Sequence, residues 1–352
     1  MKKNLIARIF LLGLFLLTII LFSYFNQTNK NLVSNVVFKE KQQPDPLTIT
    51  AMREKSYPGS DIKIEEVLPD GSNYHQYITS YKSDGLKIYA LLTIPVGDPS
   101  VNSGQLKPAN GWPVIVFNHG YIPPADYRTT ERYGAYTDAF ARSGYIVFRA
   151  DYRGHGNSDG NPEGAYYSPA YTVDVLNAVA SIKKYKDANP AKIGMWGHSM
   201  GGSITLRSMV TTKDIKAGVI WAGVVASYED MAKNWRRSRP WMPSEREQAF
   251  RRPGRQALIE KYGSPEENPQ FWKSIAPISY VKDISGPVQI HHGEADEEVP
   301  LLFSKKLNDA MRDAGKTVEF YTYSGDNHNI SNNLDTALQR SVDFFDKYLK
   351  TK

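Results

Sequence analysis

Ser199 lies in a glycine-rich stretch that could make it a nucleophile. Residues Gly197 to Gly201 read Gly-His-Ser-Met-Gly, the pattern G-x-S-x-G, which is typical of a serine on a strained turn between a strand and a helix. Glycines at both ends of such a turn leave room for the neighbouring backbone. A serine hydroxyl attacks an acyl group when a base removes its proton and a third group orients that base. The pattern therefore predicts acyl-transfer chemistry, provided that an acid and a base follow.

An acidic residue suited to this role follows the apolar stretch 288–291. Asp296 comes a few residues after the end of this expected strand, within reach of a base on the next loop. Glu294, Glu297 and Glu298 stand close to it in the chain and are alternatives. We predict Asp296 to be the acid, because its position after the strand end is the one expected for the acid of such a triad.

His328 is predicted to be the general base. The chain has seven histidines, and on a sheet of this kind the expected chain order is serine, acid, histidine. Of the seven, His328 alone comes after Asp296, and it follows the expected strand 318–323. Catalytic groups gather at the carboxyl ends of parallel strands. The three residues are therefore predicted to meet at that edge of the sheet.

Two backbone N–H groups are predicted to bind the oxyanion of the tetrahedral intermediate. One belongs to Met200, which follows the nucleophile at the start of a helix, where the helix dipole also favours negative charge. The other belongs to Tyr121, in the loop after the apolar stretch 114–117, where Gly120 allows a sharp turn. The Tyr121 hydroxyl is an alternative donor.

The elements that must position these residues alternate between strand and helix. Short apolar runs predict strands buried on both faces, and stretches with helical spacing lie between them. The expected strands are 74–81, 86–94, 114–117, 145–150, 193–196, 217–222, 288–291 and 318–323, and the expected helices are 48–55, 133–142, 168–184, 200–209, 302–314 and 334–350. This alternation predicts an α/β fold with a mostly parallel sheet and helices on both faces.

The stretch 227–278 interrupts the alternation. It has no apolar run suited to a strand, and we interpret it as a mainly helical cap inserted between two strands. Residues 231–262 include nine basic and three acidic side chains, an excess of six that equals the formal charge of the whole chain. Such a cap could attract anionic substrates or phospholipid headgroups. The interpretation that we favour is a solvated helical surface whose tryptophans pack on the sheet domain.

Several motifs together resemble the α/β-hydrolase fold. They are Asn118-His119-Gly120, the stretch 151–158, the stretch 197–202, the stretch 292–296 with Val299-Pro300, and His328. The last two, with the stretch 83–88, resemble the catalytic domain of prolyl oligopeptidase-type serine peptidases and their esterase relatives. The resemblance covers about residue 62 to the end of the chain. It implies nucleophile Ser199, acid Asp296, base His328 and oxyanion donors at Tyr121 and Met200, with no metal and no organic cofactor.

Peptidases of this family usually carry a β-propeller or helical domain ahead of the catalytic domain, which restricts access to short peptides. Here an apolar segment and a polar tether stand in that place. We predict a serine hydrolase that forms an acyl-enzyme and acts on short peptides or carboxylic esters. One alternative is a carboxylesterase or lipase-like enzyme without peptidase activity. Another is a non-catalytic binding protein on the same fold.

Arg153 lies in the motif Asp151–Gly156, whose glycines predict a tight wall of the crevice. We expect this motif to take no part in proton transfer. The guanidinium of Arg153 is predicted to hold the loop through charge-assisted hydrogen bonds.

The first 25 residues differ from the rest of the chain. Lys2, Lys3 and Arg8 precede an uninterrupted apolar run from Ile9 to Phe22, whose length is at the lower limit for a membrane-spanning helix. No small-x-small cleavage site follows, so we predict a signal anchor at 1–25, a tether at 26–61 and a catalytic domain at 62–352. The basic residues predict a catalytic domain outside the cytoplasm. Cleavage of the segment would make the protein secreted.

Composition excludes several classes of protein. The chain of 352 residues has no cysteine, which excludes disulfides, thiolate metal sites and a cysteine nucleophile. Despite a formal charge of +6, no recognised nucleic-acid-binding module is present, and no nucleic-acid partner is predicted. The sequence leaves the oligomeric state open.

Overall fold

The computed structural model describes residues 17–27, 43–97, 106–235 and 245–350, without the side chains of residues 245–253. The chain forms two compact units, Met1–Pro44 and Asp45–Lys352. In the first, residues 17–27 are helical and their large apolar side chains are exposed. No helix within the described residues is long and apolar enough to span a membrane. Residues 1–16, which hold much of the predicted anchor, lie outside the described part of the chain.

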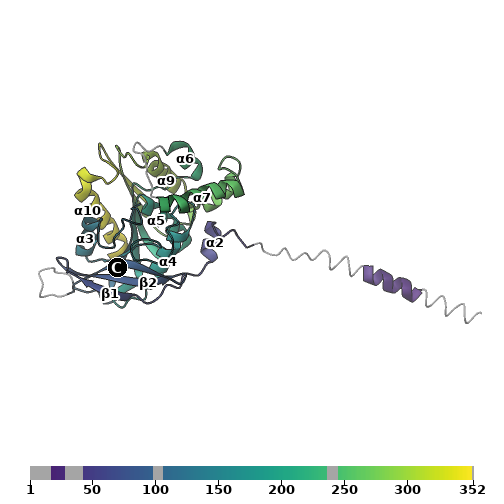
Figure 1. Ribbon diagram of the computed structural model, residues 1–352, viewed down its shortest axis with the longest axis horizontal. Helices are drawn as coiled ribbons and strands as arrows, with labels where there is room; N and C mark the ends of the chain where they lie inside the picture. The colour runs from purple at the N-terminus through teal and green to yellow at the C-terminus, as the bar shows by residue number, and fades with distance from the viewer. Residues whose placement is uncertain (1–16, 28–42, 98–105, 236–244, 351–352) are drawn as a thin grey trace, which may run out of the picture. The chain divides into compact units, whose positions relative to one another are not determined.

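The second unit is built on a sheet, in which nine strands of the described chain follow the order β1-β2-β3-β5-β4-β6-β7-β8-β9 (Figure 1). β1, β2, β3 and β5 pair antiparallel, and β5, β4, β6, β7, β8 and β9 pair parallel. The strands are β1 (Lys63–Leu68), β2 (Tyr74–Ser83), β3 (Leu86–Pro95), β4 (Trp112–Asn118), β5 (Ile146–Ala150), β6 (Ala188–His198), β7 (Ile215–Trp221), β8 (Val288–Gly293) and β9 (Val318–Tyr323). The mostly parallel sheet predicted from the sequence is confirmed.

Helices cover both faces of this sheet, because alternate side chains of each central strand point to opposite faces. On β4, Val114 and Val116 belong to one hydrophobic cluster, while Ile115 and Phe117 belong to the other. The first cluster includes side chains of α2 (Ile49–Glu54), α4 (Ala170–Ile182), α5 (Met200–Thr211) and α9 (Leu301–Asp313); the second includes those of α3 (Gly134–Arg142), α10 (Leu334–Phe345) and the π-helical turn η3 (Asp346–Lys350). Burial on both faces explains the unbroken apolar run of β4.

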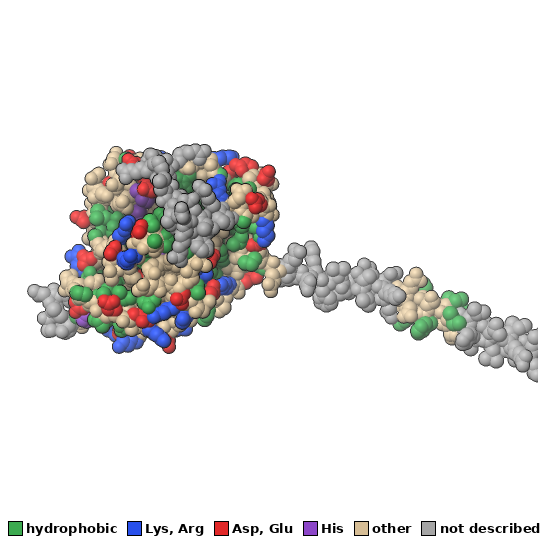
Figure 2. Space-filling view, in the orientation of Figure 1, with side chains coloured by type: hydrophobic (Ala, Val, Ile, Leu, Met, Phe, Trp, Pro, Cys, Tyr) green, Lys and Arg blue, Asp and Glu red, His purple; other side chains and the backbone are tan. Residues whose placement is uncertain are grey.

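β1 is an edge strand that the sequence analysis did not predict. Five of its six residues are exposed, so it lacks the buried face that gives a strand its alternating pattern. Acidic and basic side chains are mixed over β1 and β2 on the face that Figure 2 shows. Charged side chains are a common protection of a sheet edge against pairing with another chain.

The second unit begins earlier than the predicted start at residue 62. Residues from Asp45 onward belong to it, although the tether was predicted to run to residue 61. Ile49 and Met52 of α2 are buried, and the Thr48 hydroxyl accepts a hydrogen bond from the Ala51 N–H as an N-cap. These two apolar side chains pack in the core of the sheet domain, and Arg53 Nε of the same helix donates to the Val210 carbonyl at 2.8 Å.

The cap lies between β7 and β8. Its described part consists of α6 (Tyr228–Asn234), α7 (Glu245–Tyr262), α8 (Pro269–Ile275) and the 3-10 helix η1 (Pro277–Asp283). The insertion is therefore helical where it is described. The structure does not describe most of the basic side chains of the cap, namely Arg236, Arg237, Arg239, Arg246, Arg251 and Arg252. The positive charge of the cap therefore stays a prediction.

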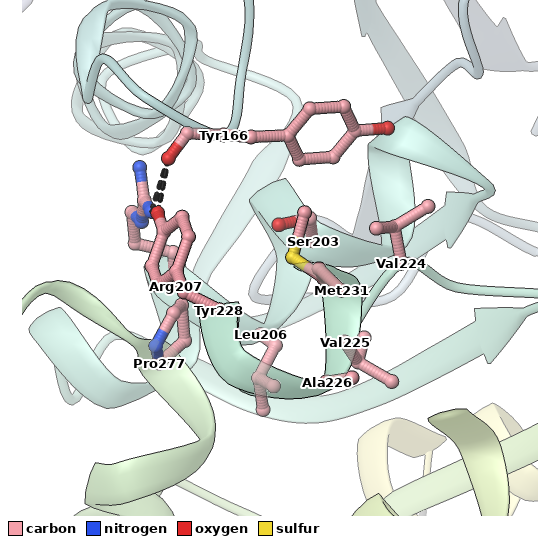
Figure 3. Close-up of a pocket in the computed structure, with 10 residues that line it drawn as sticks. All are labelled: Tyr166, Ser203, Leu206, Arg207, Val224, Val225, Ala226, Tyr228, Met231 and Pro277. Carbon is pink, nitrogen blue, oxygen red and sulfur yellow. Dashed lines mark hydrogen bonds between the residues drawn. The ribbon is translucent and has the colours of Figure 1, made fainter. Parts of the chain in front are cut away.

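Arg207 of α5 joins the cap to the sheet domain (Figure 3). Its buried guanidinium donates to the carbonyl of Ala165 at 3.2 Å, to the Tyr228 hydroxyl at 3.0 Å and to the carbonyl of Ile275 at 3.4 Å. The Tyr228 hydroxyl in turn donates to the carbonyl of Tyr166. The cavity beside these groups measures about 10 Å³, room for about one water molecule. It is too small for a substrate.

Candidate active site

Ser199 lies on the turn between β6 and α5. Its φ of 55° and ψ of −116° form a conformation that costs a residue with a Cβ on the order of 1–3 kcal/mol. Its N–H donates to the carbonyl of Trp221 at 2.9 Å, and its carbonyl accepts from the N–H of Gly202 at 3.0 Å. These bonds to β7 and to α5 hold the strained turn in place.

Glycines at both ends of this turn allow close backbone contacts. A Cβ on Gly201 would lie 2.0 Å from the carbonyl oxygen of Asn118, and one on Gly197 would lie 2.3 Å from that of Gly201. Because these neighbours are backbone atoms, a side chain could fit only if β4 or α5 moved. The turn that carries Ser199 is thus packed closely between α5 and the end of β4, the strand that precedes the Tyr121 loop.

Asp296 and His328 form a hydrogen-bonded pair on the loops after β8 and β9. His328 Nδ1 lies 2.8 Å from Asp296 Oδ2, and the Asp296 side chain is only 1 % exposed. The other carboxylate oxygen accepts the N–H groups of Glu298 at 2.8 Å and Val299 at 2.9 Å. His292 Nε2 lies 3.1 Å from Asp296 Oδ2. Burial alone would raise the pKa of Asp296, but hydrogen bonds from His292 and His328 outweigh it and hold the pKa below its usual range.

The other carboxylates of this loop are arranged differently. Glu294 is exposed and accepts a hydrogen bond from the Thr322 hydroxyl at 2.8 Å. Glu297 is exposed, and Glu298 is partly buried and is one of the residues that line a cleft. Among the described residues, Asp296 is the carboxylate that contacts His328.

Ser199 and His328 line one cleft with a volume of about 490 Å³, a size typical of small-molecule sites. Its other lining residues are Gly120, Tyr121, Ile122, Arg132, Tyr133, Tyr136, His198, Glu298 and Asn329. The structure therefore brings Ser199, His328 and Tyr121 to the same cavity. Met200 begins α5 and its side chain is buried, so its predicted role concerns its backbone N–H alone.

A hydrogen-bond relay that the sequence analysis missed connects the loop of Tyr121 to the loop of His328. The N–H of Gly120 donates to the Tyr133 hydroxyl at 2.9 Å, and this hydroxyl lies 2.8 Å from His198 Nδ1. His198 Nε2 lies 3.0 Å from the carbonyl oxygen of His328. Since that carbonyl only accepts, His198 carries its proton on Nε2, and its Nδ1 accepts a hydrogen bond from the Tyr133 hydroxyl. Burial, with the charge of His328, lowers the pKa of His198 to about 3.

Arg153 has the structural role predicted for it. Its Nε donates to Asp174 Oδ2 at 3.0 Å and its Nη2 to Asp174 Oδ1 at 2.8 Å, a bidentate pair. Asp151 of the same motif is fully buried and accepts the hydroxyls of Tyr127 and Thr129. Burial raises its pKa to about 6, although these hydrogen bonds act in the opposite direction. The described part of the chain holds no cluster of three or more side chains suited to bind a metal ion.

Comparison with known proteins places this chain in a family. The sequence profile described as "Prolyl oligopeptidase family" matches residues 132–352. A protein of Bacillus subtilis named "Uncharacterized peptidase YtmA" is 25 % identical over 253 residues, which are 72 % of this chain and 85 % of that protein.

Two solved structures share the fold. A puromycin-hydrolyzing peptidase of Mycobacterium tuberculosis has a TM-score of 0.62 at 19 % identity, covering 80 % of this chain and 41 % of its own. Est1E of Butyrivibrio proteoclasticus, solved with ferulic acid, has a TM-score of 0.57 at 21 % identity, covering 77 % of this chain and 99 % of its own. This chain thus matches less than half of the peptidase but nearly all of Est1E.

Proposed function

Because the chain belongs to the prolyl oligopeptidase family, we propose that it is a serine hydrolase that cleaves carboxylic esters or short peptides through an acyl-enzyme on Ser199. The observation that carries this proposal is the Asp296–His328 hydrogen bond of 2.8 Å, with His328 and Ser199 in the walls of one cleft. An oriented imidazole beside a serine on a strained turn is the arrangement that nucleophilic acyl transfer requires.

In the proposed reaction, His328 Nε2 takes the proton of the Ser199 hydroxyl as Oγ bonds to the substrate carbonyl carbon. The N–H groups of Tyr121 and Met200 would bind the resulting oxyanion. Collapse of the intermediate breaks the bond to the leaving group, which takes the proton from His328. A water molecule then attacks the acyl-enzyme with His328 again as base, which releases the acid and restores Ser199.

Asp296 supports each of these steps as a carboxylate. Its lowered pKa keeps it ionised at neutral pH, so that it accepts the Nδ1–H of His328 and leaves Nε2 unprotonated. It also stabilises the imidazolium that forms when His328 takes the serine proton. The Nδ1 proton stays on His328 throughout, and Asp296 is not protonated in any step.

Esters and short peptides are both proposed as substrates, because the neighbours in fold include a peptidase and Est1E, whose structure holds ferulic acid. A panel of p-nitrophenyl esters and of aminoacyl and dipeptidyl p-nitroanilides would separate the two classes. Hydrolysis of esters alone would favour a carboxylesterase. An increase in rate when the ester forms micelles would favour the lipase-like alternative.

A fluorophosphonate probe tests the nucleophile. The full-length protein should be labelled covalently, and Ser199→Ala should not be labelled although it folds normally. Ser203→Ala is a matched control, because Ser203 lies one turn further along α5 and should not affect labelling. No labelling of the wild type, or equal labelling of Ser199→Ala, would favour a non-catalytic binding protein.

We further propose that residues 1–25 anchor the protein in a membrane with the catalytic unit outside the cytoplasm. Basic residues precede the apolar run, and the large apolar side chains between Leu17 and Phe25 are exposed in the helix 17–27. The full-length protein should sediment with membranes and need detergent for release, whereas a variant that lacks residues 1–25 should not sediment. Recovery of the full-length protein in the aqueous fraction would contradict the anchor.

A further inference from the structure

Arg132 places an unpaired guanidinium in the wall of the cleft. Beside the histidines, the charged side chains that line the cleft are Arg132 and Glu298. Within the described residues, the side chain of Arg132 makes no ion pair and no hydrogen bond, while its backbone carbonyl accepts one from Arg149. A cation at a cavity wall that forms no ion pair with any described carboxylate, Glu298 included, is suited to bind an anionic ligand.

The backbone beneath this guanidinium is strained and firmly held. Arg132 and Tyr133 have φ values of 56° and 52°, in the left-handed region that side chains other than glycine rarely adopt. Arg149, which is 1 % exposed, donates to the carbonyls of Arg132 at 2.8 Å and Glu131 at 3.4 Å, and to that of Thr129. Strain of this kind persists where the surroundings fix it, and it occurs often at ligand sites.

Arg132 begins a segment that contacts the loop of His328. Tyr133, the next residue, contacts His198 through its hydroxyl, and His198 contacts the backbone of His328. The Tyr136 hydroxyl donates to the carbonyl of Asn329 at 3.2 Å. The segment that begins with Arg132 therefore runs along the loop of His328, and His328 must protonate the leaving group in the proposed mechanism.

We propose that Arg132 binds a carboxylate carried by the leaving group of the substrate. The guanidinium matches the two oxygens of a carboxylate in a bidentate pair. The substrates would be esters or amides whose leaving alcohol or amine bears an acid group, such as a short peptide with a free carboxyl end. The bond to the acyl carbon breaks, the leaving group takes the proton from His328, and the carboxylate itself does not react. This inference rests on the proposed function.

A pair of esters with equal acyl groups tests it. The acetate ester 4-acetoxybenzoate carries a carboxylate on its leaving group, and 4-acetoxybenzamide is its neutral counterpart. The wild type should prefer the acid, by kcat/KM, by about tenfold or more. Arg132→Gln should reduce this ratio to about one, and Arg132→Lys should retain part of it. Arg142→Gln, which removes the same charge from the last turn of α3, should keep the wild-type ratio.

An unchanged ratio in Arg132→Gln would overturn the proposal. A second pair, p-nitrophenyl hemisuccinate and p-nitrophenyl butyrate, places the charge on the acyl group instead. If Arg132→Gln lowered the preference only in this second pair, the assignment to the leaving group would be wrong.

A binding measurement separates this inference from the proposed function. If the wild type hydrolysed neither ester, the proposed function would fail, and calorimetry could still measure the affinity of Ser199→Ala for 4-hydroxybenzoate. The double variant Ser199→Ala, Arg132→Gln should bind it about tenfold more weakly. Equal affinity of the two proteins would overturn the carboxylate site.

Discussion

At the scale of the residue, the carboxylate of Asp296 is defined by the donors around it. It lies within hydrogen-bond distance of His328, His292 and the N–H groups of Glu298 and Val299. Two of these donors belong to its own loop, which curls around the carboxylate. The position of the carboxylate oxygen that accepts the hydrogen bond of His328 is therefore fixed before any substrate binds.

Asp296→Asn should lower kcat by about 10⁴-fold while leaving the fold intact. An amide can present its NH₂ group to His328 Nδ1, which then accepts instead of donating, and the proton of the imidazole moves to Nε2. In that tautomer His328 cannot take the serine proton. Hydrolysis of p-nitrophenyl acetate would measure the effect, and circular dichroism would check the fold.

Glu294→Gln is the matched control for this change. It removes a carboxylate from the same loop, but one whose contact is the Thr322 hydroxyl. Its kcat should stay within about twofold of the wild type, since isolated surface substitutions have small effects. A large loss in Glu294→Gln with little loss in Asp296→Asn would assign the acid to Glu294.

At the scale of the element, the packing of α5 against β4 should depend on the absence of one Cβ. Gly201→Ala would place that atom 2.0 Å from the carbonyl oxygen of Asn118 and 2.8 Å from that of His119. The strand end and the Tyr121 loop would have to move, so both stability and kcat should fall. We expect a loss of about 2 kcal/mol or more, in the range of overpacked core sites, measured by urea unfolding.

Gly134→Ala provides the control for this substitution. No atom lies within 4 Å of its added Cβ, and Gly134 is the first residue of α3. Alanine is the better helix former, so this variant should be as stable as the wild type or more stable. A Gly201→Ala variant of wild-type stability and activity would show that α5 and β4 can separate freely.

The central strands could be predicted because both of their faces are buried, which makes residues 114–117 of β4 and 217–221 of β7 read as unbroken apolar runs. β1 could not, because its stability comes from pairing with β2 while its own side chains are mostly exposed. The boundary near Asp45 also escaped prediction. Two buried residues in α2 dock a segment whose polar composition is otherwise that of a tether.

The positions of Ser199, Asp296 and His328 could be predicted because each follows a strand and the order of the three is fixed by the fold. The family resemblance found in the sequence is confirmed. The relay through Tyr133 and His198 had no sequence signal, because it depends on how the loop between β4 and α3 folds. That loop is shaped by the buried Arg149, whose partners are backbone carbonyls that a sequence does not reveal.

At the scale of the whole molecule, buried neutral histidines couple the fold to pH. Burial lowers the pKa of His198 and of His291 to about 3, and it lowers that of His119 well below its ordinary value. In the unfolded chain a histidine binds its proton near pH 6.5. Below that pH the unfolded state therefore binds protons that the folded state does not, and stability falls as pH falls. Asp151 acts in the opposite direction. Because its pKa is raised to about 6, the folded state binds a proton there before the unfolded state does, and this raises stability as pH falls.

His291→Gln should remove one part of this pH dependence. His291 is buried and is not among the residues that line the cleft; its Nδ1 lies 2.8 Å from the Tyr323 hydroxyl and its Nε2 lies 2.7 Å from Gln289 Oε1. The depressed pKa of His291 should lower the free energy of unfolding of the wild type by roughly 2 kcal/mol between pH 7 and pH 5. In His291→Gln the difference between the two pH values should shrink by that amount.

Urea unfolding followed by tryptophan fluorescence at both pH values would measure this difference. His75→Gln is the control, because its side chain is 45 % exposed; this variant should keep the wild-type pH dependence. An equal change in stability between pH 7 and pH 5 for wild type and His291→Gln would mean that His291 is protonated in the folded state.

The strained backbone of Ser199 lowers the stability of the fold, while the proposed activity requires its hydroxyl. Glycine adopts a positive φ without the Cβ strain that serine meets there, so Ser199→Gly would relax the turn between β6 and α5 while removing the hydroxyl. Selection for a stable fold alone would favour glycine at this position. Under the proposed function, the nucleophilic hydroxyl is the reason to keep a serine there despite the strain of its backbone.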